Sequence, residues 1–222
     1  MKRSHRGVLA RCFSAVVVLS VPGLASTAQA TPFYLVNTVN FYGNSYYVDQ
    51  TAGNRFTPTS DLSVFSLGIF DYGLDGMGES HQVGIFDSGG TLLTSAVVGA
   101  GTVGRLDGEF RYTDIAPLTL AAGETYTIAA LFLTHADVMG YADVSGLAID
   151  GHISVGTDPS RWHAPSGADL AYPDFDYDKS AHFYVTANFE FEEASSSVPD
   201  AGSSLLLFGI GLMALRAWRT KP

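Results

Sequence analysis

The chain has 222 residues, of which 46% are hydrophobic and 12% aromatic, and it carries 22 acidic residues against 12 basic ones. Residues 31–197 contain 21 of the acidic and five of the basic residues, so this part alone has a net charge of −16. Such a surface repels phosphate backbones and therefore argues against nucleic-acid partners, while its length suits one domain with its own core.

The first 30 residues have the three parts of a secretory signal peptide. A basic start is followed by an apolar run at residues 12–21, and Ala28-Gln29-Ala30 supplies the small residues that signal peptidase requires. We expect cleavage after Ala30, which also removes the only cysteine, Cys12. The mature chain then has no thiol, as suits passage through an oxidising compartment. The basic residues of this signal are Lys2, Arg3, Arg6 and Arg11.

Residues 31–192 show the two-residue alternation of β-strands and no helical repeat. The clearest run places apolar side chains at every second position from Phe183 to Phe191, with His182, Tyr184 and further polar residues between them. Asp87-Ser88-Gly89-Gly90 is typical of a hairpin turn. We predict an all-β domain, an antiparallel β-sandwich of jelly-roll-like type, over residues 31–192.

Two sets of residues resemble metal sites only partly. Asp71, Asp75, Gly76 and Glu79 occupy positions of an EF-hand loop, but Gly73 and Gln82 replace required ligands, so a solvated turn is the simpler interpretation. The histidines after the signal lack the close paired spacing of zinc motifs. We expect His81 and His182 to begin strands and to be half-exposed.

The acidic run Asp174-Phe175-Asp176-Tyr177-Asp178 is the candidate metal site. In an extended chain Asp174, Asp176 and Asp178 lie on one side, where Ca²⁺ would relieve their mutual repulsion. A solvated acidic run, partly neutralised by Lys179, is the alternative. No other cofactor is expected.

Aromatic side chains in the loop-rich stretch 140–180 are the candidate glycan contacts. Trp162, Tyr172 and Tyr177 lie there among several carboxylates, and flat rings beside acidic hydrogen-bonding groups suit sugars. Core packing is the alternative role for these rings.

No G-x-S-x-G elbow, P-loop or Rossmann fingerprint occurs, so we expect a protein that is not an enzyme. A polysaccharide hydrolase with an unidentified acidic pair is the different-class alternative.

The last segment, residues 193–222, predicts a linker followed by a membrane-directed tail. The motif Val198-Pro199-Asp200-Ala201-Gly202 precedes an apolar helix at about residues 203–218, and the helix is flanked by Arg216, Trp218, Arg219 and Lys221. As a helix, the uncharged run of fifteen residues is about 22 Å long, short of a bilayer core of about 30 Å. A permanent anchor with snorkelling arginines is one interpretation, and a disposable signal is the other.

This arrangement resembles the exosortase sorting signals of Gram-negative bacteria, the PEP-CTERM class, and above all its VPDSG variant, with Ala201 in place of serine. The resemblance implies that an exosortase recognises the Pro199 region, removes the tail and passes the protein to the cell surface or beyond. Signal peptidase and exosortase are thus the implied partners during export, with transient contact to the inner membrane.

Residues 75–98 and 108–131 resemble a domain of unknown function that recurs in exosortase-sorted proteins and is similar to bacterial extracellular jelly-roll modules. The resemblance implies a β-sandwich over about residues 46–190 and supplies no catalytic residues. We therefore expect an exported matrix or biofilm component that is structural or binds glycans, with exopolysaccharide or neighbouring matrix proteins as partners.

Overall fold

The computed structural model describes residues 30–37, 48–177 and 181–194, and these form strands, turns and one short 3-10 helix, η1 (Val144–Gly146). Every strand pairing among them is antiparallel, which confirms the predicted all-β sandwich. The strands are β1 (Thr31–Pro32), β2 (Tyr34–Val36), β3 (Gln50–Pro58), β4 (Leu62–Phe70), β5 (His81–Asp87), β6 (Leu92–Val98), β7 (Arg105–Asp107), β8 (Phe110–Leu120), β9 (Tyr126–Phe132), β10 (Gly140–Asp143), β11 (Leu147–Ile149), β12 (Ile153–Ser154), β13 (Ser160–His163), β14 (Phe175–Asp176), β15 (His182–Val185) and β16 (Ala187–Glu193).

The signal peptide, the sorting motif and the apolar tail all lie outside the described residues. Within the described part of the chain, no helix has the length and hydrophobicity needed to span a membrane. The first and last strands of that part, β1 and β16, pair with each other, so both ends of the domain leave from the same sheet.

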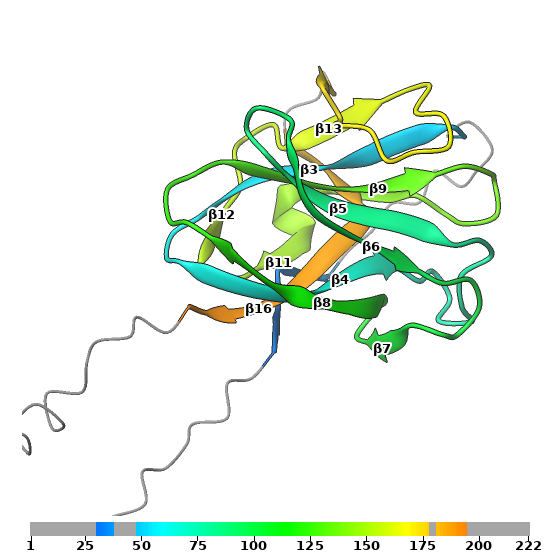
Figure 1. Cartoon of the computed structure of the whole chain (residues 1–222), viewed down its shortest axis with the longest axis horizontal. Helices are drawn as coiled ribbons and strands as arrows, with labels where there is room; N and C mark the ends of the chain where they lie inside the picture. Colours follow the sequence, from blue (N-terminus) through cyan, green and yellow to red (C-terminus); the bar gives the residue numbers. More distant parts are fainter. Residues whose placement is uncertain (1–29, 38–47, 178–180, 195–222) are drawn as a thin grey trace, which may run out of the picture.

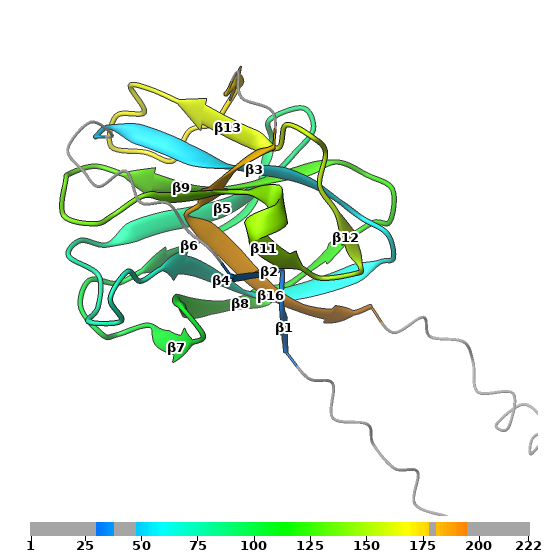
Figure 2. The ribbon, with the colours of Figure 1, turned by 180° about the vertical axis from the view of Figure 1, so that it is seen from behind.

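Two sheets form the layers of the sandwich (Figure 1). One has the strand order β1-β16-β4-β8-β7, and the other has the order β14-β13-β3-β9-β5-β6, with β12 paired to β3. The chain crosses between them from β3 to β4 and back to β5, so that strands close in sequence face each other across the core. Two short pairs, β10 with β15 and β11 with β2, add to the side seen in Figure 2.

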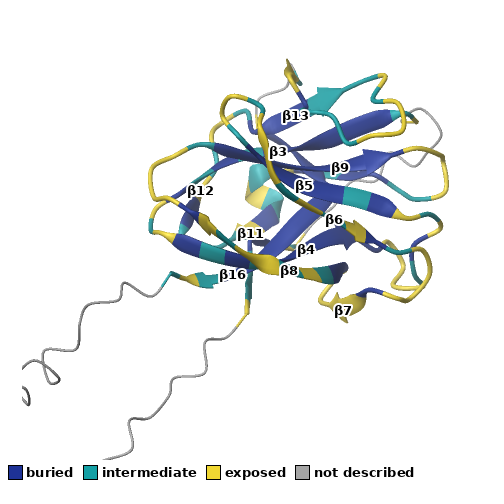
Figure 3. Ribbon diagram, in the orientation of Figure 1, coloured by how far each residue is buried: buried dark blue, intermediate teal, exposed yellow. Residues whose placement is uncertain are grey.

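Aromatic rings fill the space between the layers. Phe33 stacks on Phe189 with ring centroids 5.0 Å apart, and Phe56 lies 5.1 Å from each of these two rings. Figure 3 shows the resulting burial along β3, β9, β5 and β16. The apolar positions predicted from Phe183 to Phe191 are all at most 1% exposed.

The polar residues between those apolar positions are buried as well, which the alternating pattern did not predict. Asn188 donates to Tyr34 O (2.9 Å) because β2 crosses that face, and Tyr184 N donates to Asn54 Oδ1 (2.9 Å). Glu190 accepts a hydrogen bond from Ser66 Oγ (2.5 Å) and pairs with Arg105. A face that is covered by further chain must satisfy its polar groups internally, and these contacts do so for the side chains of Asn188, Asn54 and Glu190.

One expectation holds in part and another is wrong. The loop after β4 is exposed from Tyr72 to Asp75, as a solvated turn requires, but Asp71 at its start is 2% exposed and forms an ion pair with Arg111. His81 and His182 do begin strands, but they are 0% and 6% exposed rather than half-exposed, because neighbouring loops and strands cover them.

Candidate functional site

A short hairpin, β13 paired with β14, forms one edge of the larger sheet. Trp162 lies opposite Phe175 across this hairpin and opposite Ala52 of β3 on its other side. Ser166 fastens the connecting loop to β3 and to Asp49, the residue that precedes β3. Its Oγ donates to Thr51 Oγ1 (2.9 Å), and its backbone N donates to Asp49 O (2.8 Å). The hairpin is therefore held on a regular strand, so its side chains have a defined arrangement.

Three rings meet on this hairpin, and we call Trp162, His163 and Phe175 the aromatic edge. The Phe175 ring lies 5.1 Å from Trp162 at an interplanar angle of 31°, and 6.0 Å from His163 at 23°. Trp162 is partly buried against the core, whereas Phe175 is 48% exposed. An exposed ring supported from behind by two others offers a flat apolar surface to a ligand.

Two carboxylates flank the aromatic edge. Asp174 Oδ1 lies 2.7 Å from His163 Nδ1, and Asp176 pairs with the guanidinium of Arg161. Both carboxylates are about half exposed, with relative side-chain exposures of 52% and 55%, while Arg161 is only 6% exposed. The buried guanidinium and the imidazole therefore orient two acceptor groups that still face solvent.

The structure brings one of the three predicted glycan residues to this edge. Trp162 is part of it, but Tyr172 packs instead against Phe86, with ring centroids 5.5 Å apart. Tyr177 packs 4.2 Å from the ring of His182 and is partly buried against the core. Phe175 was not among the predicted contacts, although the alternation Asp174-Phe175-Asp176 was the signal that could have indicated its exposed ring.

The predicted calcium ligands are only partly described. Asp174 and Asp176 lie on the hairpin with His163 and Arg161 as partners, and Asp178 lies outside the described residues. Two carboxylates suit Ca²⁺ as donors, but the neighbouring guanidinium already offsets one of the negative charges. Calcium binding here stays a prediction.

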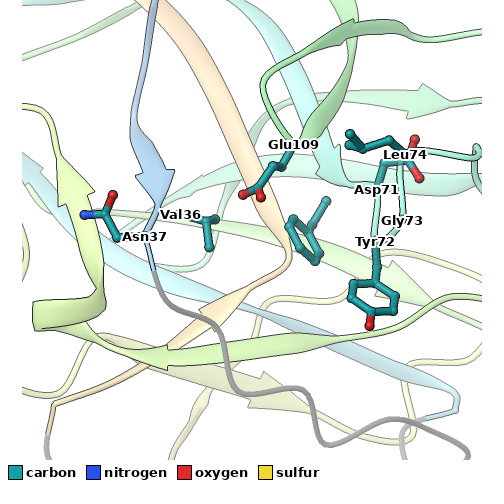
Figure 4. Close-up of a pocket in the computed structure, with 8 residues that line it drawn as sticks. Val36, Asn37, Asp71, Tyr72, Gly73, Leu74 and Glu109 are labelled. Atoms are coloured by element: carbon teal, nitrogen blue, oxygen red, sulfur yellow. The ribbon is translucent and has the colours of Figure 1, made fainter.

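A separate pocket of about 360 Å³ lies beside the loop that follows β4 (Figure 4). Figure 4 shows the Glu109 carboxylate extending toward Val36 in this pocket. Asp71 also contributes to the wall, but its carboxylate is already bound to Arg111 at 2.6 Å and to Gly76 N at 3.2 Å. The pocket therefore does not combine two available carboxylates. Its lining residues are Val36, Asn37, Phe70, Asp71, Tyr72, Gly73, Leu74 and Glu109.

Comparison with known protein families identifies the tail. Residues 197–221 match the VPDSG-CTERM motif, which includes the Val198–Gly202 stretch and the apolar segment after it. This match supports a C-terminal sorting signal of the PEP-CTERM type, and it indicates an exported protein that an exosortase-type system processes and sorts to the cell surface. No curated protein matches the chain significantly.

Proposed function

We propose that the protein is a non-catalytic surface or matrix component that binds a glycan of the exopolysaccharide through its aromatic edge. The supporting observation is the exposed ring of Phe175, stacked near His163 and backed by Trp162 on a hairpin that is fastened to the sheet. The match to the VPDSG-CTERM motif supports sorting to the cell surface, where an exopolysaccharide would be accessible to the domain.

The aromatic edge suits the apolar face of a sugar ring. Sugar C–H groups pack on aromatic faces, and burying a ring that is 48% exposed removes apolar surface from water. The contacts of Ser166 hold the hairpin to Thr51 of β3 and to Asp49. Because the hairpin is already fixed in this way, ligand binding would cost little of its conformational entropy.

The flanking carboxylates give the edge its preference among glycans. Asp174 and Asp176 offer acceptors to sugar hydroxyl groups, and their pairing with His163 and Arg161 holds them in place. Residues 31–197 carry a net charge of −16, so the domain as a whole repels an acidic polymer but not a neutral one. We therefore expect neutral glycans to be the preferred ligands. Because the tail resembles the sorting signals of Gram-negative bacteria, we expect these glycans at the surface of a Gram-negative cell.

Fluorescence of Trp162 tests this proposal directly. The full chain has only two tryptophans, so a Trp218→Phe background in detergent leaves Trp162 as the sole reporter. We expect titration with exopolysaccharide from the producing cells, or with neutral dextran fragments, to change its emission in a saturable way, and acidic alginate to bind more weakly.

Phe175→Ala should weaken that binding about 3- to 10-fold, which corresponds to one lost aromatic contact. Tyr72→Ala is the matched control, because Tyr72 is an aromatic residue of similar exposure, 54%, at the separate pocket. Equal affinity of both variants, or no saturable binding of any polysaccharide, would contradict the proposal.

A further inference from the structure

Three side chains of metal-ligand type meet where two loops cross, away from the aromatic edge. Glu79, His81 and Asp137 each offer one ligand atom, and these atoms all lie within 4.8 Å of one another. We call them the Glu79–His81–Asp137 cluster. The pairing of β5 with β9 brings them together, because His81 begins β5 and Asp137 lies in the loop that follows β9.

The orientation of the His81 ring is fixed by a backbone carbonyl. Nδ1 lies 2.9 Å from Leu131 O, and a carbonyl can only accept, so the Nδ1 atom carries a hydrogen. In the neutral imidazole, Nε2 then presents its lone pair to Asp137 Oδ2, which is 2.8 Å away. Two acceptors at that distance need either a proton or a cation between them.

The two carboxylates are held by backbone N–H groups. Asp137 accepts from Gly78 N (2.7 Å) and Glu79 N (2.9 Å), and Glu79 Oε1 accepts from the backbone N–H groups of residues 133 and 134 at 3.2 and 3.0 Å. A carbonyl-bound histidine and hydrogen-bonded carboxylates are the outer contacts that orient ligands in metal sites. The ligand set is therefore positioned before any ion arrives.

The cluster has an excess of negative charge. His81 is 0% exposed, and the ring of Phe132 lies 4.7 Å from it, so water screens the imidazole poorly. Within the described part of the chain, neither Glu79 nor Asp137 forms an ion pair with a lysine or arginine. An imidazole that ligates a metal is neutral, so the two carboxylates supply the two negative charges that a divalent cation neutralises.

We propose that this cluster binds one divalent transition-metal ion of the Zn²⁺ class. One imidazole nitrogen with two carboxylate oxygens is a donor set that Zn²⁺ accepts, whereas Ca²⁺ and Mg²⁺ prefer oxygen ligands alone. The ion replaces the proton between His81 and Asp137 and fastens the loop before β5 to the loop after β9. This inference is independent of glycan binding at the aromatic edge.

Calorimetric titration of the full chain, without a tag and after removal of metals, tests the proposal with ZnCl₂, CaCl₂ and MgCl₂ as probes. We expect one Zn²⁺ per chain and weaker or no binding of the other two ions. At a free Zn²⁺ concentration of about 100 times its dissociation constant, the melting temperature should rise by about 5–10 °C.

Glu79→Gln and Asp137→Asn should each weaken Zn²⁺ binding at least about tenfold. Glu79→Gln retains an oxygen for the two backbone N–H groups, so it separates loss of metal from loss of fold, which circular dichroism checks. His135→Ala removes an exposed histidine of the same loop and should bind Zn²⁺ like the unmodified chain. Absence of saturable Zn²⁺ binding, or unchanged binding by folded Glu79→Gln, would overturn the proposal and leave a buried imidazole–carboxylate pair.

Discussion

Asp71 and Arg111 form an ion pair that is buried on both sides, with Arg111 Nε 2.6 Å from Asp71 Oδ2. The guanidinium also donates to Gly104 O (3.2 Å) and Leu74 O (3.4 Å), and Asp71 accepts from Gly76 N. One pair thus ties the loop after β4 to β8 and to the turn before β7.

Removing one partner of this pair should destabilise the protein strongly. Asp71→Asn leaves a buried guanidinium without its counter-charge, and we expect the free energy of unfolding to fall by about 3–5 kcal/mol. Urea denaturation measures this change. Asp107→Asn is the control, because Asp107 pairs with Arg105 at the surface and should change stability by less than about 1 kcal/mol. Similar small losses in both variants would show that the Asp71 pair contributes little.

The turn carboxylate of Asp87 gives a prediction about pH. Hydrogen bonds from the backbone N–H groups of Thr91 (2.8 Å) and Gly89 (2.9 Å) lower the pKa of this carboxyl from its usual 3.8, with the Thr91 bond as the largest cause. A carboxyl with a lowered folded pKa stabilises the fold above its unfolded pKa, and this contribution is lost as the pH falls through the folded pKa.

Asp87→Asn should therefore lower the melting temperature at neutral pH, and the difference from the unmodified chain should shrink in strong acid. Melting curves recorded from pH 7 downward measure both effects. A difference that stays constant down to the lowest pH would mean that ionisation of Asp87 does not stabilise the turn.

Gly53 is a position where β3 and β9 approach too closely for a side chain. A Cβ atom placed there would lie 1.9 Å from Ile128 O and 2.5 Å from Ala129 Cα, both of which are backbone atoms. We expect Gly53→Ala to cost more than about 3 kcal/mol of unfolding free energy, since the strands must separate. Gly151→Ala, with no atom within 4 Å of its new Cβ, should stay within about 0.5 kcal/mol of the unmodified chain in the same urea titration. Equal stability of the two variants would contradict this close approach.

The strands and the hairpin turn could be predicted from sequence because their signals are local. The apolar alternation from Phe183 to Phe191 corresponds to the core face of β15 and β16, and the turn at Asp87 joins β5 to β6. Burial of the opposite face could not be predicted, because it depends on β2 crossing over Asn188 from the other end of the chain.

The two candidate sites were harder to predict for the same reason. Trp162 and Phe175 meet only because β13 and β14 pair in one register, which no periodic pattern indicates. His81 and Asp137 are 56 residues apart and carry no recognised spacing. The strand pairing of β5 with β9 decides this contact, and it is visible only in the fold.

Export and removal of the tail can be tested most directly by intact mass spectrometry of native protein recovered from the outside of the producing cells. We expect a chain that begins at Thr31 and ends close to the Val198–Gly202 motif, without the apolar segment at 203–218. Recovery of the polypeptide at full length, with both terminal segments intact and inside the cell, would contradict export through this sorting signal.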